Sequence, residues 1–314
     1  MDLFFTALGS IVVLFSLILV GFICRKTNLV SERAQKDVTN IVLYAMLPAT
    51  IVKTMTKPID KDAIEMLLTM IAITVVSYIF ITILSILVSK RFNLPDKQRD
   101  VLFGGMSFAN ITFMGLPVQE AVFGSEAVFF TIMSQLVIFE IYCWSIGLSI
   151  LEKHKKGGKF HISIKEVLKK PGVFASIIGL ILLFAKVELP PMVDNFVTML
   201  GKGISPLAMI AVGFMLANSN IKEAVRNKYL YISSFVKLLV IPLVMIGVLY
   251  ALNIRGLVMA IPVIEMAMPT AAYLAMLSAI ADNDTTLASE QIFVSSLLSL
   301  ITIPVIVGIL GFTM

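Results

Sequence analysis

The sequence has little charge, and it has few residues of the types that enzymes use for catalysis. Only 14% of its 314 residues are charged, and it contains two histidines and two cysteines. Soluble domains carry about 25% charged residues, so an ordinary water-soluble core is excluded. Both histidines, His154 and His161, lie in one polar stretch, and no metal-ligand spacing or glycine-rich nucleotide loop occurs. We therefore expect neither an enzyme nor a bound cofactor or metal.

The cysteines and the basic residues exclude two further classes, a disulfide scaffold and a nucleic-acid-binding protein. Cys24 and Cys143 are far apart and have no neighbouring Cys or His, so we expect two free thiols. The formal net charge is +5, but the basic residues form short clusters between apolar runs rather than one stripe. Nucleic acid is therefore not an expected partner.

Hydrophobic residues are what the sequence has in excess, at 58% of the chain. A bilayer core about 30 Å thick is crossed by about 20 helical residues. The apolar runs are continuous and rich in Leu, Ile and Met, which favours helices over alternating strands. The sequence thus predicts an all-α integral membrane protein in a lipid bilayer, with ten spans at residues 3–24, 35–56, 63–89, 98–122, 126–151, 172–188, 195–217, 228–252, 255–281 and 287–312.

The charges of the loops predict the orientation of these spans. The loops after the first, third, fifth and seventh spans hold 18 Lys and Arg residues, whereas the opposite side holds five. By the positive-inside rule the first group of loops is cytoplasmic. We therefore expect a multi-pass protein of the cell (plasma) membrane, with both termini outside and the central loop in the cytoplasm.

The central loop, residues 152–171, is expected to be a cytoplasmic linker between two five-helix units, 1–151 and 172–314. Because five is an odd number, the two units must have opposite orientations in the bilayer. The pattern therefore predicts a 5+5 inverted repeat. In support of it, each half has a proline near the middle of its second and fourth spans: Pro48 and Pro117, then Pro206 and Pro269.

The fourth span is not expected to be one regular helix. Pro117 lacks an amide donor and clashes with the carbonyl group four residues earlier, and Gly115 adds backbone freedom. We expect an unwound stretch over about 110–116, followed by a half-helix that starts at Pro117. Asn110, Thr112 and freed backbone groups would then face one point. A simple proline kink is the alternative, and this segment alone favours neither.

The ninth span contains Pro262 and Pro269, with Glu265 one turn before the second proline. A carboxylate in the membrane must face water, a cation or a partner, or else hold a proton. Glu265 is therefore the candidate ligand of a coupling ion, Na⁺ or H⁺. The alternative is a structural ion pair with Lys202 or Lys237, which also lie within spans.

Broken helices at matching positions of inverted halves indicate a transport site at the middle of the membrane. Two half-helix N-termini would direct partial positive charges at one ligand, which favours an anion. Gln135 in the fifth span is a further candidate, although a hydrogen bond between helices explains it equally well. The expected substrate-binding residues are Asn110, Thr112, Gly115, Pro117, Gln135, Pro269 and Thr270.

The segment Asn110 to Pro117, Asn-Ile-Thr-Phe-Met-Gly-Leu-Pro, resembles the first crossover of the auxin efflux carrier family, whose plant members have Asn-x-x-x-Met-Gly-x-Pro there. Ala267-Met-Pro269 is similar to the second crossover, and the tail 287–304 is similar to the bacterial branch with malate and malonate permease-like proteins. The resemblance covers essentially the whole chain. It implies substrate binding at both crossovers and the fold of bile acid sodium symporter-like proteins, in which a scaffold bundle and a transport bundle move as an elevator.

The chain departs from the plant pattern in two ways. Its central loop is short and lacks the long regulatory segment of many plant carriers. Glu265 stands where plant members have an uncharged polar residue, so their mode of coupling does not transfer to this chain.

The expected function is secondary active transport of a small organic anion by alternating access. Malate- or malonate-like carboxylates and auxin-like weak acids are the expected substrates. An anion channel or a non-transporting membrane sensor is the alternative. The anion, the direction and the coupling to Na⁺, H⁺ or the membrane potential stay open at this stage, and a homodimer is compatible with the sequence.

Overall fold

The structure, a computed structural model, describes residues 2–56, 60–153, 168, 171–218 and 224–313. Within these residues the chain is helical and forms no strand. Helices lie over all ten segments that the apolar runs predict. Both cysteines are free thiols, as expected. The predicted linker, with its two histidines, lies mostly outside the described residues.

The first half of the chain contains both long helices and short helical pieces that follow one another directly. The label η marks a single π-helical turn, which is wider than an α-helical turn. The elements are α1 (Asp2–Lys26), α2 (Glu32–Ile41), η1 (Val42–Met46), α3 (Leu47–Met55), α4 (Lys61–Ser89), α5 (Asp96–Ser107), η2 (Ile111–Gly115), α6 (Leu116–Phe123), α7 (Ser125–Thr131), η3 (Ile132–Leu136), α8 (Val137–Tyr142), η4 (Cys143–Gly147) and α9 (Leu148–Leu151).

The second half repeats this mixture and ends in one long helix. Its described elements are α11 (Pro171–Phe184), α12 (Pro191–Lys202), α13 (Ile204–Asn218), α15 (Lys228–Phe235), η5 (Val236–Val240), α16 (Ile241–Ala251), α17 (Leu257–Ala267), α18 (Tyr273–Ile280) and α19 (Thr285–Thr313).

Several described helical stretches have the length and the surface of membrane spans. Large apolar side chains are exposed along them, including Val76 at 64%, Ile181 at 62% and Leu68 at 60%. Water-soluble proteins rarely expose apolar surface on this scale, so these side chains indicate contact with lipid. The all-helical membrane protein is confirmed, while the number of ten spans stays a prediction. Six described stretches are long and apolar enough to cross a membrane: Lys36–Met55, Lys61–Ser89, Ser125–Leu151, Pro191–Ala217, Lys228–Ala251 and Thr285–Thr313.

Three prolines follow directly on π-helical turns. Pro48, Pro117 and Pro242 each take the second position of a helix that η1, η2 or η5 precedes. In an α-helix a proline clashes with the carbonyl group four residues earlier. The wider π-helical turn relieves that clash, so the chain passes each proline without ending the helix.

The helices α1 and α13 pack with their backbones in close contact. A Cβ atom at Gly213 would lie 2.1 Å from the carbonyl oxygen of Ile18, and one at Gly21 would lie 2.2 Å from that of Ile210. No other residue type permits this approach. Small residues at helix crossings are typical of membrane proteins, where close dispersion contacts drive helix association.

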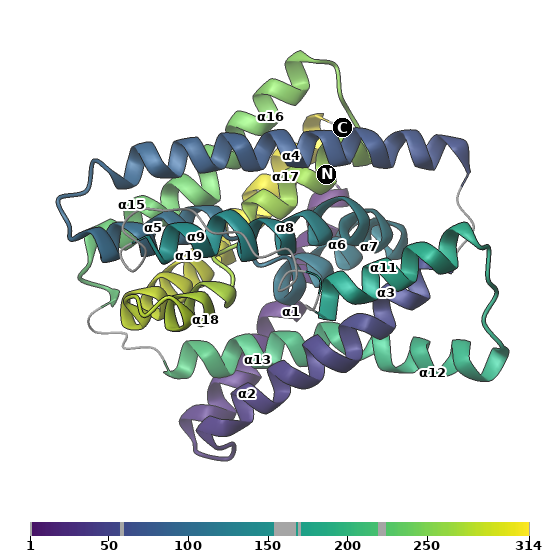
Figure 1. The fold of residues 1–314 in the computed structure, drawn as a ribbon, viewed down its shortest axis with the longest axis horizontal. Coiled ribbons are helices and arrows are strands. Elements are labelled where there is room, and N and C mark those ends of the chain that lie inside the picture. The colour runs from purple at the N-terminus through teal and green to yellow at the C-terminus, as the bar shows by residue number, and fades with distance from the viewer. Residues whose placement is uncertain (1, 57–59, 154–167, 169–170, 219–223, 314) are drawn as a thin grey trace.

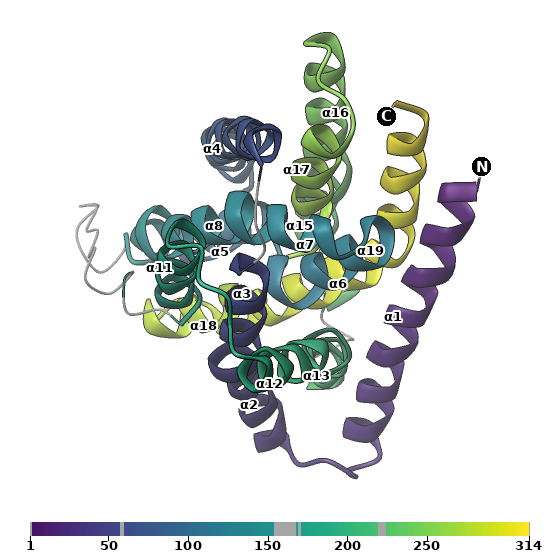
Figure 2. The ribbon, with the colours of Figure 1, turned by 90° about the vertical axis from the view of Figure 1, so that its right-hand side faces the viewer.

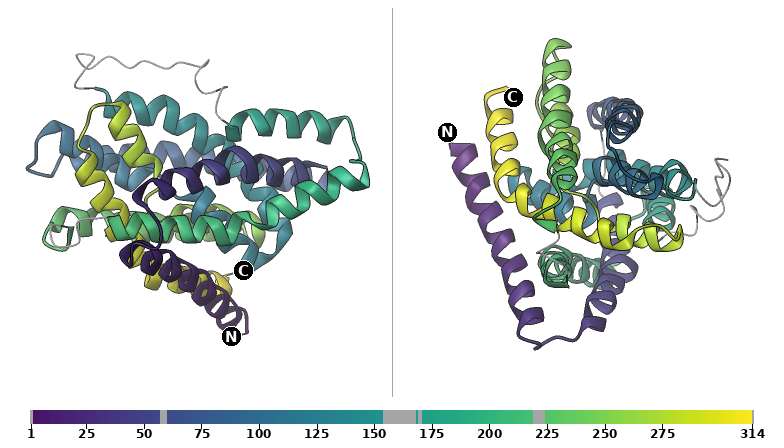
Figure 3. Two further views of the ribbon diagram at one scale, coloured as in Figure 1. Left: turned by 90° about the horizontal axis from the view of Figure 1, so that it is seen from below. Right: turned by 90° about the vertical axis from the view of Figure 1, so that its left-hand side faces the viewer.

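The helices pack in two groups. The first bundle consists of α1, α2, α3, α11, α12 and α13, and the second bundle consists of α4 to α9 and α15 to α19. Figures 1 and 2 show α2, α3, α12 and α13 on one side of the molecule and α4, α16 and α17 on the opposite side. The start of α1 and the end of α19 lie near each other, as Figure 3 shows from two further sides. Contacts of α1 with α6 and α19, and of α13 with η2, join the two bundles.

Candidate functional site

The fourth predicted span is broken, but earlier than the sequence predicts. Residues 108–110 separate α5 from η2. The expected unwound stretch over about 110–116 is therefore wrong, because the chain is helical again from Ile111, and α6, with Pro117 in its first turn, follows η2 directly. One reason is that η2 accommodates the proline. The other is that the side-chain oxygen of Asn110 accepts a hydrogen bond from the backbone nitrogen of Phe113 (3.3 Å), which caps the helix at this point.

The ninth predicted span is broken as well. α17 ends at Ala267 and α18 begins at Tyr273. Pro269 lies in this break, where its missing N–H group prevents the helix from continuing. Met268, the residue before the proline, is extended with φ −64° and ψ 147°, because a residue that precedes proline avoids the helical conformation.

The two breaks cross and pair with each other through their backbones. The backbone nitrogen of Asn110 donates to the carbonyl oxygen of Pro269 (2.9 Å), and that of Ala271 donates to the carbonyl oxygen of Phe108 (3.0 Å). Together they form one antiparallel bridge. Broken backbone at membrane depth is tolerated only where its polar groups find partners. The crossing supplies these partners, and it brings the candidate residues of two spans to one place.

Two candidate side chains at the crossing keep polar atoms without a hydrogen-bond partner in the described part of the chain. Asn110, which is 4% exposed, uses its side-chain oxygen for the cap, while its Nδ2 donates no hydrogen bond to another described residue. Thr112 is 2% exposed, and its hydroxyl group has no hydrogen-bond partner among the residues that the structure describes. Buried polar groups are normally paired. These two groups are therefore suited to a polar ligand that enters the crossing.

Thr270, by contrast, holds the second break in place. Its hydroxyl group donates to the carbonyl oxygen of Gly105 (2.7 Å) and accepts from Nε2 of Gln291 (3.5 Å). Its backbone nitrogen donates to Oγ of Ser295 (3.0 Å). Gln291, which also accepts from Oγ of Ser233 (2.6 Å), is a residue that sequence reasoning missed. A glutamine one turn before a serine in an apolar helix is the signal that could have found it.

Glu265 is buried where the two broken helices touch. Its carboxylate rests against Gly115, since a Cβ atom there would lie 2.3 Å from Oε2. Gln119 lies one helical turn after Gly115, and its amide lies beside the carboxylate of Glu265. The Nε2 atom of this amide donates to the carbonyl oxygen of Ile261 (3.0 Å). Among the described residues, both oxygens of Glu265 and Oε1 of Gln119 have no hydrogen-bond partner. Gly115 thus makes room for a carboxylate, a role that the sequence does not reveal.

Lys237 is the cation whose charge acts on Glu265. It is fully buried on η5, which packs against α17. Its Nζ atom makes no hydrogen bond within the described ranges, so the two groups interact through their charges without a close ion pair. Of the two lysines considered from the sequence, Lys237 is the one that faces Glu265. Lys202 is exposed at the end of α12.

Gln135 and Glu140 each join two helices. Nε2 of Gln135 donates to Oγ1 of Thr74 in α4 (2.5 Å), and Oε1 of Glu140 accepts from the hydroxyl group of Tyr273 at the start of α18 (2.5 Å). The hydrogen bond between helices, which the sequence left open for Gln135, is therefore present. Substrate binding by Gln135 stays a prediction.

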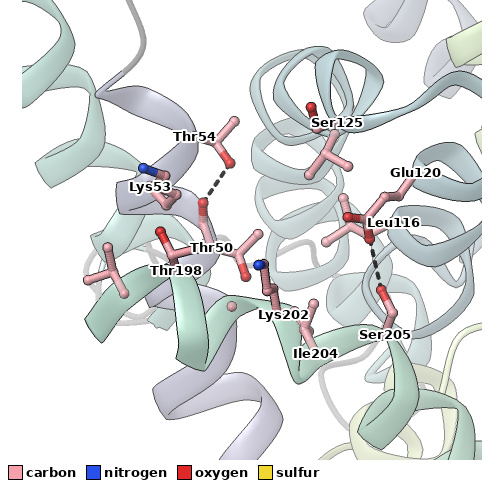
Figure 4. Close-up of a pocket in the computed structure, with 13 residues that line it drawn as sticks. Thr50, Lys53, Thr54, Leu116, Glu120, Ser125, Thr198, Lys202, Ile204 and Ser205 are labelled. Carbon is pink, nitrogen blue, oxygen red and sulfur yellow. Dashed lines mark hydrogen bonds between the residues drawn. The ribbon is translucent and has the colours of Figure 1, made fainter. Parts of the chain in front are cut away.

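A pocket of about 180 Å³ lies between the two bundles, beside the first broken helix. It is lined by residues of α3, α6, α7, α12 and α13, and it reaches Leu116, the neighbour of Gly115. Figure 4 shows the ammonium group of Lys202 near Thr50, and the hydrogen bond from Ser205 to Glu120 (3.1 Å). The lining also contains Lys53, whose ammonium group is paired with Asp194. The pocket thus offers groups of both charges and several hydroxyl groups to a polar ligand.

The chain is similar to transport proteins over nearly its whole length. Residues 6–307 match the model of the family described as "Membrane transport protein". An uncharacterized transporter of Methanocaldococcus jannaschii is 26% identical over 298 residues, which cover 93% of this chain and 95% of that protein. An uncharacterized transporter of Methanothermobacter thermautotrophicus is 27% identical over 293 residues, 92% of this chain and 93% of that protein. These matches agree with the family resemblance of the crossover motifs.

Proposed function

Because the chain belongs to the family of membrane transport proteins, we propose that it is a secondary transporter of small organic anions in the cell membrane. The proposed substrates are malate- or malonate-like carboxylates or auxin-like weak acids. The proposed binding site is the point where the two broken helices cross. The main support for this proposal is the crossing itself, where both helices are broken and buried polar groups stay available to a ligand.

Several features of the crossing favour an anion. The helical stretch Ile111–Phe123 and α18 both begin beside it, and each helix N-terminus carries about half a positive charge. Nδ2 of Asn110 and the hydroxyl group of Thr112 add two hydrogen-bond donors. The pocket with Lys202 lies close by, next to Leu116, and is proposed as the entrance.

Transport is proposed to occur when the second bundle moves against the first, so that the crossing faces each side of the membrane in turn. The pocket lies at the boundary between the bundles, where such a motion would open and close it. A membrane potential alone provides about 2.3 kcal/mol per charge per 100 mV, which is enough to drive a monoanion. Glu265 is the proposed point at which a positive charge, from Na⁺, from H⁺ or from a side chain, couples to this motion.

The substitution Asn110→Asp tests the binding site. Aspartate keeps the oxygen that caps Phe113 but replaces the NH₂ donor with a negative oxygen that repels an anion. Losing a hydrogen bond to a charged ligand costs about 1.5–3 kcal/mol, so uptake should fall roughly 10- to 100-fold while the fold is retained. Uptake and counterflow of radiolabelled malate, malonate and indole acetate into proteoliposomes measure this, with Na⁺, H⁺ and potential gradients imposed separately.

Asn93→Asp, at an exposed position in the loop after α4, is the matched control and should transport like the wild type. Equal saturable flux in the Asn110 variant would contradict the proposed binding site. Flux without saturation or counterflow would indicate a channel. No flux under any gradient would remove this class of substrates and favour a sensor.

A further inference from the structure

The second bundle contains two ionisable side chains of opposite sign that are both completely buried. Glu265 on α17 and Lys237 on η5 each have 0% of their surface exposed. Their elements pack against each other, and each side chain feels the charge of the other. Neither the carboxylate oxygens nor Nζ has a hydrogen-bond partner in the part of the chain that the structure describes. A buried charge without an opposite charge nearby is strongly unfavourable, so each group depends on the other.

The oxygen atoms around Glu265 are of the kind that a hard cation binds. Its two carboxylate oxygens and Oε1 of Gln119 are all buried and unpaired within the described residues. Carboxylate and amide oxygens are the preferred ligands of hard metal cations. The same carboxylate touches Gly115, so it connects this group of oxygens to the first broken helix and hence to the proposed substrate site.

We propose that the ammonium group of Lys237 is a tethered cation, which supplies from within the second bundle the positive charge that a solution cation would otherwise bring to Glu265 and makes anion transport independent of Na⁺. This inference rests on the proposed function, because it concerns the coupling of that same transport. An ammonium group carries the same single charge as Na⁺, but its side chain cannot leave the second bundle. The site thus stays neutral through the transport cycle without taking up an ion. Removing the ammonium group leaves an uncompensated charge beside these three unpaired oxygens, which Na⁺ then satisfies.

The test compares Lys237→Met, Glu265→Gln and the double variant with the wild type. Methionine and glutamine keep the size of the side chains and remove the charges. Uptake of radiolabelled malate, malonate and indole acetate is measured in NaCl and in choline chloride. We expect equal rates for the wild type, and for Lys237→Met a rate that is about tenfold higher in NaCl, because only Na⁺ restores the counter-charge. The double variant should again be indifferent to Na⁺, because its site carries no charge.

Thermal unfolding of the purified proteins provides a readout that does not depend on transport. A ligand that binds the folded state raises the unfolding midpoint. NaCl, but not choline chloride, should therefore raise the midpoint of Lys237→Met and leave the wild type and the double variant unchanged. Lys228→Met, which removes an exposed lysine at the start of α15, is the control and should not respond to Na⁺.

Several outcomes would overturn the proposal. One is a wild-type protein whose transport requires Na⁺, and another is a Lys237→Met variant that responds to Na⁺ no more than the wild type does. If Lys237→Met fails to fold in choline chloride, its folding is tested in NaCl and in the double variant with Glu265→Gln. Recovery of folding in either case supports the proposal, and recovery in neither contradicts it. Absence of flux in every variant, with a Na⁺-dependent midpoint for Lys237→Met, would reject the proposed substrates and leave the tethered cation standing.

Discussion

At Gly115 the absence of a side chain lets the two broken helices meet. The carboxylate of Glu265 occupies the space that a Cβ atom at this position would need, because such an atom would lie only 2.3 Å from Oε2. The carboxylate is the flexible end of its side chain, so an added methyl group displaces it rather than the backbone. A substitution here should therefore affect the position of a charge more than the stability of the fold.

We expect Gly115→Ala to reduce the initial rate of anion uptake by about tenfold or more, because the displaced carboxylate loses its position beside the first broken helix. The free energy of unfolding should fall by only about 1 kcal/mol. Gly247→Ala is the control, since a Cβ atom at Gly247 meets nothing within 4 Å. Uptake in proteoliposomes and thermal unfolding in detergent measure both quantities. An unchanged uptake rate in Gly115→Ala would contradict a role for this contact.

Individual residues could be predicted from the sequence where their own chemistry singles them out. Pro269 lies in the break because proline lacks an N–H group, and Glu265 was notable because a carboxylate is rare in an apolar run. Gln119 and Gln291 were missed as parts of the site, since an amide is unremarkable until its partners are known. Lys237 could be named only as one of two partners, because the choice depends on how α17 and η5 pack.

At the scale of elements, α1 and α13 depend on a backbone contact that no side chain can relax. A Cβ atom at Gly213 would meet the carbonyl oxygen of Ile18 at 2.1 Å and the backbone nitrogen of Phe22 at 2.7 Å. The two helices would have to move apart, which would loosen the first bundle along the whole crossing. In this respect Gly213 differs from Gly115, whose neighbour is a flexible side chain.

Gly213→Ala should therefore lower the free energy of unfolding by about 1–3 kcal/mol, toward the upper end because only backbone atoms meet the new methyl group. The unfolding midpoint of the purified protein in detergent measures this loss, and Gly247→Ala again serves as the control. A midpoint equal to that of the control would show that α1 and α13 do not need this close approach.

The positions of the helix breaks show what proline can and cannot predict about an element. Pro269 marks a real interruption, whereas Pro117 lies inside a helical stretch that begins at Ile111. The difference arises because a π-helical turn and the cap by Asn110 accommodate Pro117. A sequence reveals that a proline is present, but the turn that precedes it depends on the packing of the neighbouring helices.

At the scale of the whole molecule, the helical segments were predictable because each apolar run is long enough to identify by itself. Their grouping was not predictable from composition, because α1 packs mainly with α13, almost two hundred residues later. Only the resemblance to a known family indicated two bundles. A motion of one bundle against the other must change the contacts that join the two bundles.

Two polar contacts allow a test of this motion. Ser205 of the first bundle donates to Glu120 of the second (3.1 Å), whereas Lys53 and Asp194 form an ion pair within the first bundle (2.5 Å). In a background with Cys24 and Cys143 replaced by serine, each pair is changed to two cysteines and joined with a short thiol-reactive cross-linker that a reductant cleaves. Uptake in proteoliposomes is measured before cross-linking, after it, and after reduction.

Cross-linking of Glu120→Cys with Ser205→Cys should abolish uptake, and reduction should restore it, because the link fixes the two bundles relative to each other. The link between Lys53→Cys and Asp194→Cys should leave uptake unchanged, since α3 and α12 belong to one bundle and move together. Uptake that survives a complete link across the bundles would contradict alternating access by a motion of one bundle against the other. Uptake lost in both pairs would instead place the moving boundary inside the first bundle.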